Sequence, residues 1–176
     1  MRCRMTLQEH HDSWVYVITF GNDTPTAIEQ AEKYSDDSHS AEDLHGIRHF
    51  VLFKGSKIVQ IRLHDALRIL PHLDPERPET IRRMPGMHAI MDGKPPVPAL
   101  LISFKPEPTE NRTAYGLSSD VFLVFNGPEL ASVYISNAKN IIDVEAEIPD
   151  SPRGSAPTGL RKWMRAALSR WGLSRN

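Results

Sequence analysis

The stretch Ile47–Leu63 reads IRHFVLFKGSKIVQIRL, and it predicts two strands joined by a tight turn. Its two halves, Ile47–Lys54 and Lys57–Leu63, are rich in β-branched and aromatic residues and have the length of ordinary strands. Gly55-Ser56 between them is a two-residue hairpin signal, because glycine readily adopts the backbone conformation that such turns require. The segment therefore predicts an antiparallel pair of strands.

Further strand-like runs lie on both sides of this hairpin. Trp14–Phe20 precedes it, and Ala99–Phe104 follows it with the composition of a buried strand. Val121–Phe125 begins a segment that resembles a meander of strands. Leu130–Ser136 alternates only in part, so a strand and a helix both stay open there. Ile141–Ile148 alternates apolar and acidic residues, which predicts a half-exposed strand.

Two short helices are expected between the strands. Thr24-Pro25 is a helix start, because proline suits the first helical turn, and the apolar spacing continues to about Tyr34. Asp65 is a candidate N-cap for a second helix that runs through Leu70 and ends before Pro71.

Long loops separate these elements. Ser35–Gly46 and Lys105–Ser119 are polar and rich in turn residues, and seven prolines lie between Pro71 and Pro98. We find no internal repeat in the sequence. The predicted fold is α+β: an antiparallel or mixed sheet with a few short helices, long proline-rich loops and a basic amphipathic helix at the C-terminus.

Charge and composition together divide the chain into three parts. Residues 1–150 contain 15 basic and 22 acidic side chains, a net charge of −7, whereas the residues after Asp150 carry six basic side chains and no acid. We therefore expect a globular domain over 1–148, a linker rich in proline and serine over 149–157, and a basic helix over 158–176.

The C-terminal segment, TGLRKWMRAALSRWGLSRN, is the strongest candidate for an interaction site. At 100° per residue, its apolar side chains fall within an arc of about 140°, which predicts an amphipathic helix. The apolar side chains are Leu160, Trp163, Met164, Ala167, Leu168 and Trp171. The opposite side carries Arg161, Lys162 and Arg165. A helix of about 21 Å is too short to cross a bilayer and marginal alone in water, so a surface is expected to cover its apolar face.

Four surfaces fit this helix. It docks on its own domain, or on a protein partner that includes a second copy, since tryptophan and arginine are common interface anchors. A membrane surface also suits the composition. Nucleic acid fits least, because the acidic body opposes phosphate binding.

Histidines supply the alternative chemistry. His45 and His49 have i, i+4 spacing beside acidic residues, which is a candidate metal pair, although Gly46 between them makes a helix doubtful. His64 lies next to Asp65, and a histidine beside a carboxylate suits general-base catalysis. The single cysteine, Cys3, excludes an intrachain disulfide framework and a thiolate metal site. No catalytic motif or cofactor motif is identified.

These observations favour a non-enzymatic protein-interaction module that docks through its C-terminal helix and proline-rich loops. A small metal-assisted hydrolase or histidine/carboxylate enzyme built from His45, His49 and His64 is the second hypothesis, and association with a membrane surface through the C-terminal helix is the third. The N-terminus is not followed by a secretory apolar region, and no apolar run approaches about 18 residues, so we expect a cytoplasmic location.

Overall fold

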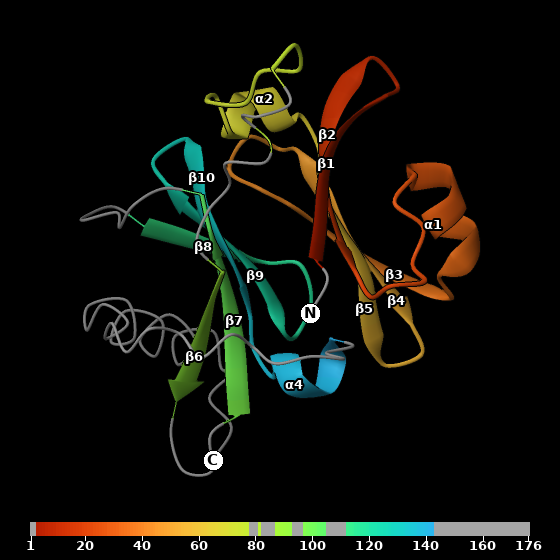
Figure 1. The fold of residues 1–176 in the computed structure, drawn as a ribbon. Coiled ribbons are helices and arrows are strands. Elements are labelled where there is room, and N and C mark those ends of the chain that lie inside the picture. The colour runs from red at the N-terminus through yellow and green to blue at the C-terminus, as the bar shows by residue number, and fades with distance from the viewer. Residues whose placement is uncertain (1–2, 78–80, 82–86, 93–96, 105–111, 143–176) are drawn as a thin grey trace.

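The computed structural model describes residues 3–77, 81, 87–92, 97–104 and 112–142, which form two antiparallel sheets packed face to face (Figure 1). Sheet A has the strand order β1-β2-β5-β4-β3, and sheet B has the order β6-β7-β10-β9-β8. The strands of sheet A are β1 Cys3–His10, β2 Ser13–Phe20, β3 Asp37–Glu42, β4 Arg48–Lys54 and β5 Lys57–Leu63. Those of sheet B are β6 Met87–Asp92, β7 Val97–Ser103, β8 Arg112–Gly116, β9 Val121–Asn126 and β10 Glu129–Ile135. The short helices are α1 Ile28–Tyr34, α2 Ala66–Ile69 and α4 Ala138–Ile141.

The two sheets share one topology, so the fold contains a structural duplication. When the five strands of each half are numbered along the chain, both sheets have the strand order 1-2-5-4-3. The hairpins β4-β5 and β9-β10 also share their register: Phe53 pairs with Ile58 and Phe125 with Leu130, each beside the same register shift. The duplication therefore extends to the pairing of individual residues.

The duplication continues past the fifth strand of each half. Asp65 and Asn137 both adopt a left-handed backbone conformation, with φ of 49° and 54°, and the chain then enters α2 or α4. These helices make reciprocal contacts, because α2 packs on β10 of the other half and α4 packs on β5. A parallel bridge between Ile58 and Ile142 joins the halves at one end. Such exchanged contacts are those of two halves related by an approximate twofold axis.

The expectation of no internal repeat is therefore wrong at the level of structure. Between residues 50–70 and 122–142, only five aligned positions carry the same residue type. They are Phe50/Phe122, Phe53/Phe125, Gly55/Gly127, Ala66/Ala138 and Ile69/Ile141. The apolar alternation and the hairpin glycine are retained instead, with φ of 56° at Gly55 and 59° at Gly127, where glycine adopts this conformation without strain. A pattern of residue classes specifies the sheets, and such a pattern is difficult to detect as a repeat of letters.

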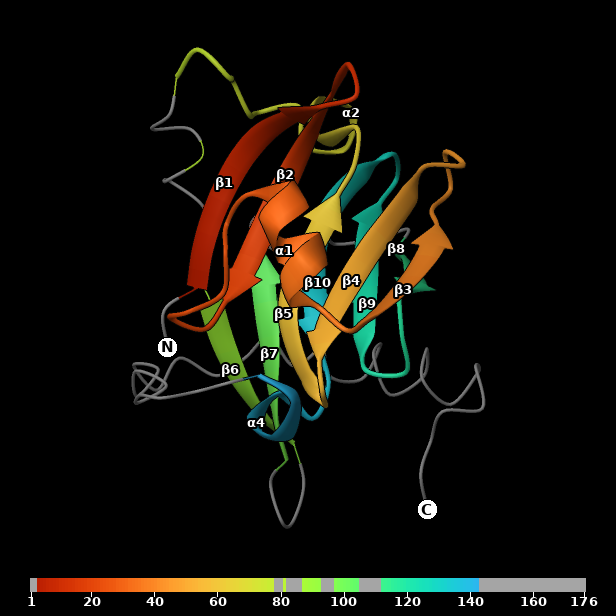
Figure 2. The same cartoon turned by 90° about the vertical axis from the view of Figure 1, so that its right-hand side faces the viewer.

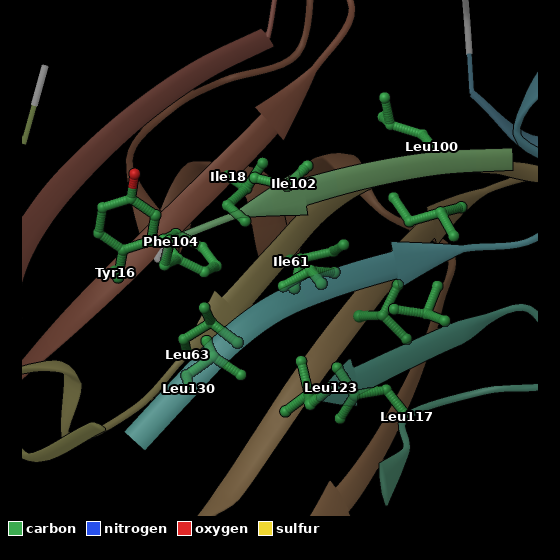
Figure 3. Packing of buried hydrophobic residues seen from close by; sticks show 14 of the residues in the cluster. Tyr16, Ile18, Ile61, Leu63, Leu100, Ile102, Phe104, Leu117, Leu123 and Leu130 are labelled. Carbon is green, nitrogen blue, oxygen red and sulfur yellow. The ribbon is translucent and has the colours of Figure 1, made fainter. Parts of the chain in front are cut away.

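The core lies between the two sheets, and both contribute equivalent side chains (Figure 3). Ile18 and Ile61 of sheet A have Ile102 and Val133 as their counterparts in sheet B, and all four are fully buried. The ring of Tyr16 meets the ring of Phe104 edge to face, with centroids 5.6 Å apart. Burial of apolar area is the main favourable term in folding, so this shared core is the principal source of stability. In the residues that the structure describes, one large core joins the two sheets, and two smaller buried clusters involve residues of α1.

Most of the apolar strands are confirmed. Trp14–Phe20 lies within β2 and Val121–Phe125 within β9, and the predicted hairpin is β4 and β5, with β4 beginning at Arg48. Leu130–Ser136 is the strand β10 apart from its last residue, so the helical alternative there is wrong. The helix expected to run to Tyr34 is α1, although it begins at Ile28 rather than near Pro25.

Two predicted loops contain strands. Ser35–Gly46 holds β3 and Lys105–Ser119 holds β8, and each is the edge strand of its sheet beside β4 or β9. Both were missed because an edge strand needs little apolar burial. Five of the six β3 residues are exposed, and only Ala41 is partly buried. Backbone pairing with an apolar neighbour forms these strands despite their composition.

The expected strand Ile141–Ile148 is wrong where it is described. Ile141 ends α4 and Ile142 forms only the isolated bridge to Ile58. Residues 143–148 lie outside the described residues, as do the linker 149–157 and the basic helix 158–176. The observed class is thus antiparallel sheet with a few short helices.

Candidate functional site

The C-terminal site residues predicted from the sequence lie outside the described residues. They are Leu160, Trp163, Met164, Leu168 and Trp171 on the apolar side, and Arg161, Lys162 and Arg165 on the basic side. Their roles stay predictions. The described residues include the candidate histidines and the outer faces of sheets A and B.

His49 and Asp43 form a buried hydrogen-bonded pair at the edge of the core. The Nε2–H of His49 donates to Oδ2 of Asp43 at 2.9 Å, and its Nδ1 accepts the backbone N–H of His64 at 3.2 Å. Oδ1 of Asp43 accepts the backbone N–H groups of His45 and Ile47 at 2.8 and 3.1 Å. Both ring nitrogens of His49 are therefore engaged, and the pair organises the turn between β3 and β4.

The protonation of this pair follows from its surroundings. Burial lowers the pKa of His49, against the opposing effect of Asp43, so the neutral ring is favoured. Burial alone would raise the pKa of Asp43, but hydrogen bonds from His49, Ile47 and His45 outweigh it and hold that pKa below its ordinary value. A neutral histidine that donates to a carboxylate is a stable structural unit. In the second half, the equivalent of His49 is Val121, an ordinary core residue.

His64 lies beside this pair, at the end of β5. Its ring packs against Phe50 at 5.3 Å between centroids and lies 6.5 Å from the ring of His10. Its Nε2 is buried and lacks a hydrogen-bond partner among the described residues. Burial, followed by the nearby His49 and His10, lowers the pKa of His64 to about 4. A neutral ring whose buried Nε2 has no hydrogen-bond partner among the described residues serves packing better than proton transfer.

The candidate metal pair is not assembled. Nε2 of His45 lies 3.0 Å from the carbonyl oxygen of Pro128, in the β9-β10 turn of the other half, whereas His49 is turned toward Asp43. Within the described ranges, no group of three or more histidine, cysteine, aspartate or glutamate side chains is arranged to hold a metal ion. The contact of His45 instead links the two halves.

An open pocket of about 210 Å³ lies at the end of the β4-β5 hairpin. The loop 21–24, Tyr34, Lys54 and Lys57 contribute to its lining. The ammonium of Lys54 lies 5.2 Å from the centroid of the Tyr34 ring, a cation–π contact. Asp23 also contributes to the lining, so the charged residues around the pocket have both signs.

The outer face of sheet A is covered by α1 (Figure 2). Ile28 packs on Val15 and Val17, and Ala31 packs on Leu52. Arg62, which is buried, fixes the helix: its Nη2 donates to the Ile28 carbonyl oxygen at 2.7 Å and its Nη1 to Glu32 Oε1 at 2.6 Å. Its Nε donates to Gln60 Oε1 at 2.6 Å. One sheet face thus binds a short helix through apolar contacts and one arginine.

The outer face of sheet B is apolar as well. Leu101, Val124 and Ala131 are its central residues, and each is at most 5% exposed. Leu101 and Val124 alternate along their strands with residues of the shared core, so they point to the opposite side. Ala131 is the counterpart of Val59, which packs on the outer face of sheet A. The described helices that pack on sheet B, α2 and α4, contact β10 and β7 from the two ends of the sandwich (Figure 1). This face is the strongest candidate for an interaction surface, and sequence reasoning missed it because the strands alone do not show which faces remain outside the core.

Searches against protein-family models, curated proteins and solved structures find no match to this chain. Among the helices in the described part of the chain, none has both the length and the apolar character that crossing a membrane requires.

Acidification should destabilise the fold through His64 and His49. Their pKa values are lower in the folded chain than the ordinary 6.5, so the unfolded chain binds more protons as the pH falls. The stability contributed by these two histidines is fully present above pH 6.5 and is lost as the pH falls toward about 4. Urea unfolding at a series of pH values should show this slope. Replacing His64 with serine, the residue at the equivalent position 136, should make the slope shallower; an unchanged slope would contradict this assignment.

Removal of the Arg62 side chain should loosen α1. Arg62→Ala leaves the Ile28 carbonyl and Gln60 without their donor, which should cost about 2–3 kcal/mol in the free energy of urea unfolding. Glu32→Gln is the matched control: the Glu32 side chain is 56% exposed, so its ion pair with Arg62 should contribute less than about 1 kcal/mol. Equal losses from the two substitutions would show that the ion pair, rather than the buried hydrogen bonds, fixes the helix.

Proposed function

We propose that this protein is a non-enzymatic interaction module, in which the β-sandwich carries a basic C-terminal helix that binds an acidic protein surface. Arg161, Lys162 and Arg165 form the contact, and the proline-rich loops supply secondary contacts. The observation that carries this proposal is that, among the described residues, a single buried cluster from Tyr16 to Ile142 already unites both sheets. In this proposal the basic segment is an appendage of that domain.

Charge supports the same proposal. Six basic side chains follow Asp150 without an acid among them, whereas residues 1–150 carry a net charge of −7. A segment of one sign attracts a partner of the opposite sign and raises the rate of encounter. A second copy of the chain offers such a surface through its own acidic body, and its binding is one outcome of the test below.

The histidines on which the enzyme hypothesis relies have structural contacts. His49 is held between Asp43 and the backbone of His64, and His45 contacts the β9-β10 turn. Catalysis by general base requires a histidine that reaches a substrate proton. These contacts favour the interaction module over the enzyme as the proposal.

A site-specific photo-crosslinker tests the proposal in the full chain. Placed at Lys162 in cells that naturally make the protein, it should give discrete protein adducts, which mass spectrometry identifies. The adducts should disappear when Arg161 and Arg165 are both replaced by glutamate, because the contact is electrostatic. The matched control is a crosslinker at Lys33, an exposed basic residue of α1, which should give none of these adducts.

Three other results would contradict the proposal. Equal adducts from both crosslinker positions would show nonspecific capture. Adducts that persist after charge reversal would exclude the basic face as the contact. Binding to mixed phosphatidylcholine and phosphatidylserine vesicles that is lost on charge reversal, with no protein adducts, would show that the segment binds a membrane surface instead.

A further inference from the structure

The starting point is the outer face of sheet B, defined by Leu101, Val124 and Ala131. Each of these side chains is buried, at 5%, 1% and 2% exposure. Buried apolar side chains on the outside of a two-layer sandwich imply a third layer over them. The helices α2 and α4 contact this sheet at its ends, and α1 lies on the other sheet (Figures 1 and 2).

The duplication shows what kind of layer fits this face. Val124 is the counterpart of Leu52, and Ala131 is the counterpart of Val59, because their hairpins share one register. In sheet A, Leu52 and Val59 pack against Ala31 of α1. Val124 and Ala131 are smaller than Leu52 and Val59, so the equivalent positions of sheet B suit a helix that presents larger apolar side chains than Ala31.

The connection that supplies α1 in the first half has no adequate counterpart in the second. The segment 21–36 joins β2 to β3 and includes α1, whereas only residues 104–111 join β7 to β8. That short connection contains Pro106 and Pro108, and proline inside a helix removes a hydrogen bond and clashes with the preceding turn. The helix for sheet B must come from elsewhere.

The C-terminal segment fits the face in pattern and in size. Its apolar arc carries Leu160, Trp163, Leu168 and Trp171, opposite three basic residues. The fourteen residues from Thr158 to Trp171 would give a helix about 21 Å long. A six-residue strand such as β9 spans about 20 Å, so the helix and the face have matching lengths.

The chain also has the reach to place this segment there. Ile142 is held beside Ile58 at one end of the sandwich, and the fifteen residues 143–157 span at most about 50 Å when extended. That length exceeds the distance across one sheet, which is about 20 Å for five strands. The linker thus permits docking on the outer face of either sheet. Because α1 already covers the outer face of sheet A, we assign the C-terminal segment to sheet B.

We propose that the chain's own C-terminal helix, residues 158–171, docks its apolar side on the outer face of sheet B, where it takes the place that α1 holds on sheet A. The tryptophans then lie against Leu101 and Val124, while Arg161, Lys162 and Arg165 face outward. This inference does not rest on the proposed function, since docking fixes the helix whether or not a partner binds its basic side.

Cysteine labelling in the full chain tests this docking. In a Cys3→Ser background, Val124→Cys reports on the outer face of sheet B, and Leu52→Cys reports on the equivalent position under α1. Replacing both Trp163 and Trp171 with glutamate should raise the maleimide labelling rate of Val124→Cys at least about tenfold, because a docked element protects the surface it covers. The labelling rate of Leu52→Cys should stay unchanged.

Several results would overturn the docking. Rapid labelling of Val124→Cys with both tryptophans intact, or slow labelling that persists in the glutamate variant, would show that another segment or nothing covers the face. Protection that weakens on dilution would assign the cover to a second copy. If Leu52→Cys also becomes reactive, the whole fold has opened, and the milder Trp171→Ser substitution decides by the same comparison. Partner adducts that persist after charge reversal would contradict the proposed function but would leave this labelling result unchanged, so the two proposals fail independently.

Discussion

The face-to-face packing of two equivalent apolar sheets is the interaction on which the rest of this structure depends. Neither sheet buries its inner face alone, and the ring contact of Tyr16 with Phe104 lies where the two surfaces meet. Equivalent strands present equivalent side chains, so the inner side chains of each sheet fill the space beside those of the other sheet. The reciprocal contacts of α2 and α4 then close the two ends.

Duplication also explains why the two halves differ where they do. The inner faces are constrained by one another and keep matching residues, such as Ile18 and Ile102. The outer faces are constrained only by what covers them. Arg62 anchors α1 on sheet A, whereas Tyr134 occupies the equivalent position on sheet B. The two outer faces therefore carry different residues, and these differences give each face a structural basis for binding a different segment.

Much of the fold follows from the sequence because its central strands are strongly apolar. Ile47–Leu63 and Val121–Phe125 combine β-branched and aromatic residues with turn signals, so local pattern and tertiary environment agree there. The polar edge strand β3 could not be predicted, because its residues are exposed and only backbone pairing with β4 defines it. The duplication was also missed, since the halves share a pattern of residue classes but few identical residues.

The candidate site divides in the same way. The amphipathic pattern of residues 158–171 is legible in the sequence, because helical period and charge separation need no tertiary information. The surface proposed to receive this helix cannot be read from the sequence, because Leu101 and Val124 come onto one face only through the pairing of β7, β10 and β9. The histidines illustrate the converse: spacing pairs His45 with His49, but the fold directs one to Pro128 and the other to Asp43.

Equilibrium unfolding of two equivalent core variants tests the shared core most directly. Ile18→Ala and Ile102→Ala each remove a fully buried side chain at matching positions of the two sheets, which should cost about 2–5 kcal/mol in either case. If one core unites the halves, both substitutions should shift the same single transition in urea, seen alike by far-ultraviolet circular dichroism and by tryptophan fluorescence. Two separate transitions, each moved by only one substitution, would contradict the account.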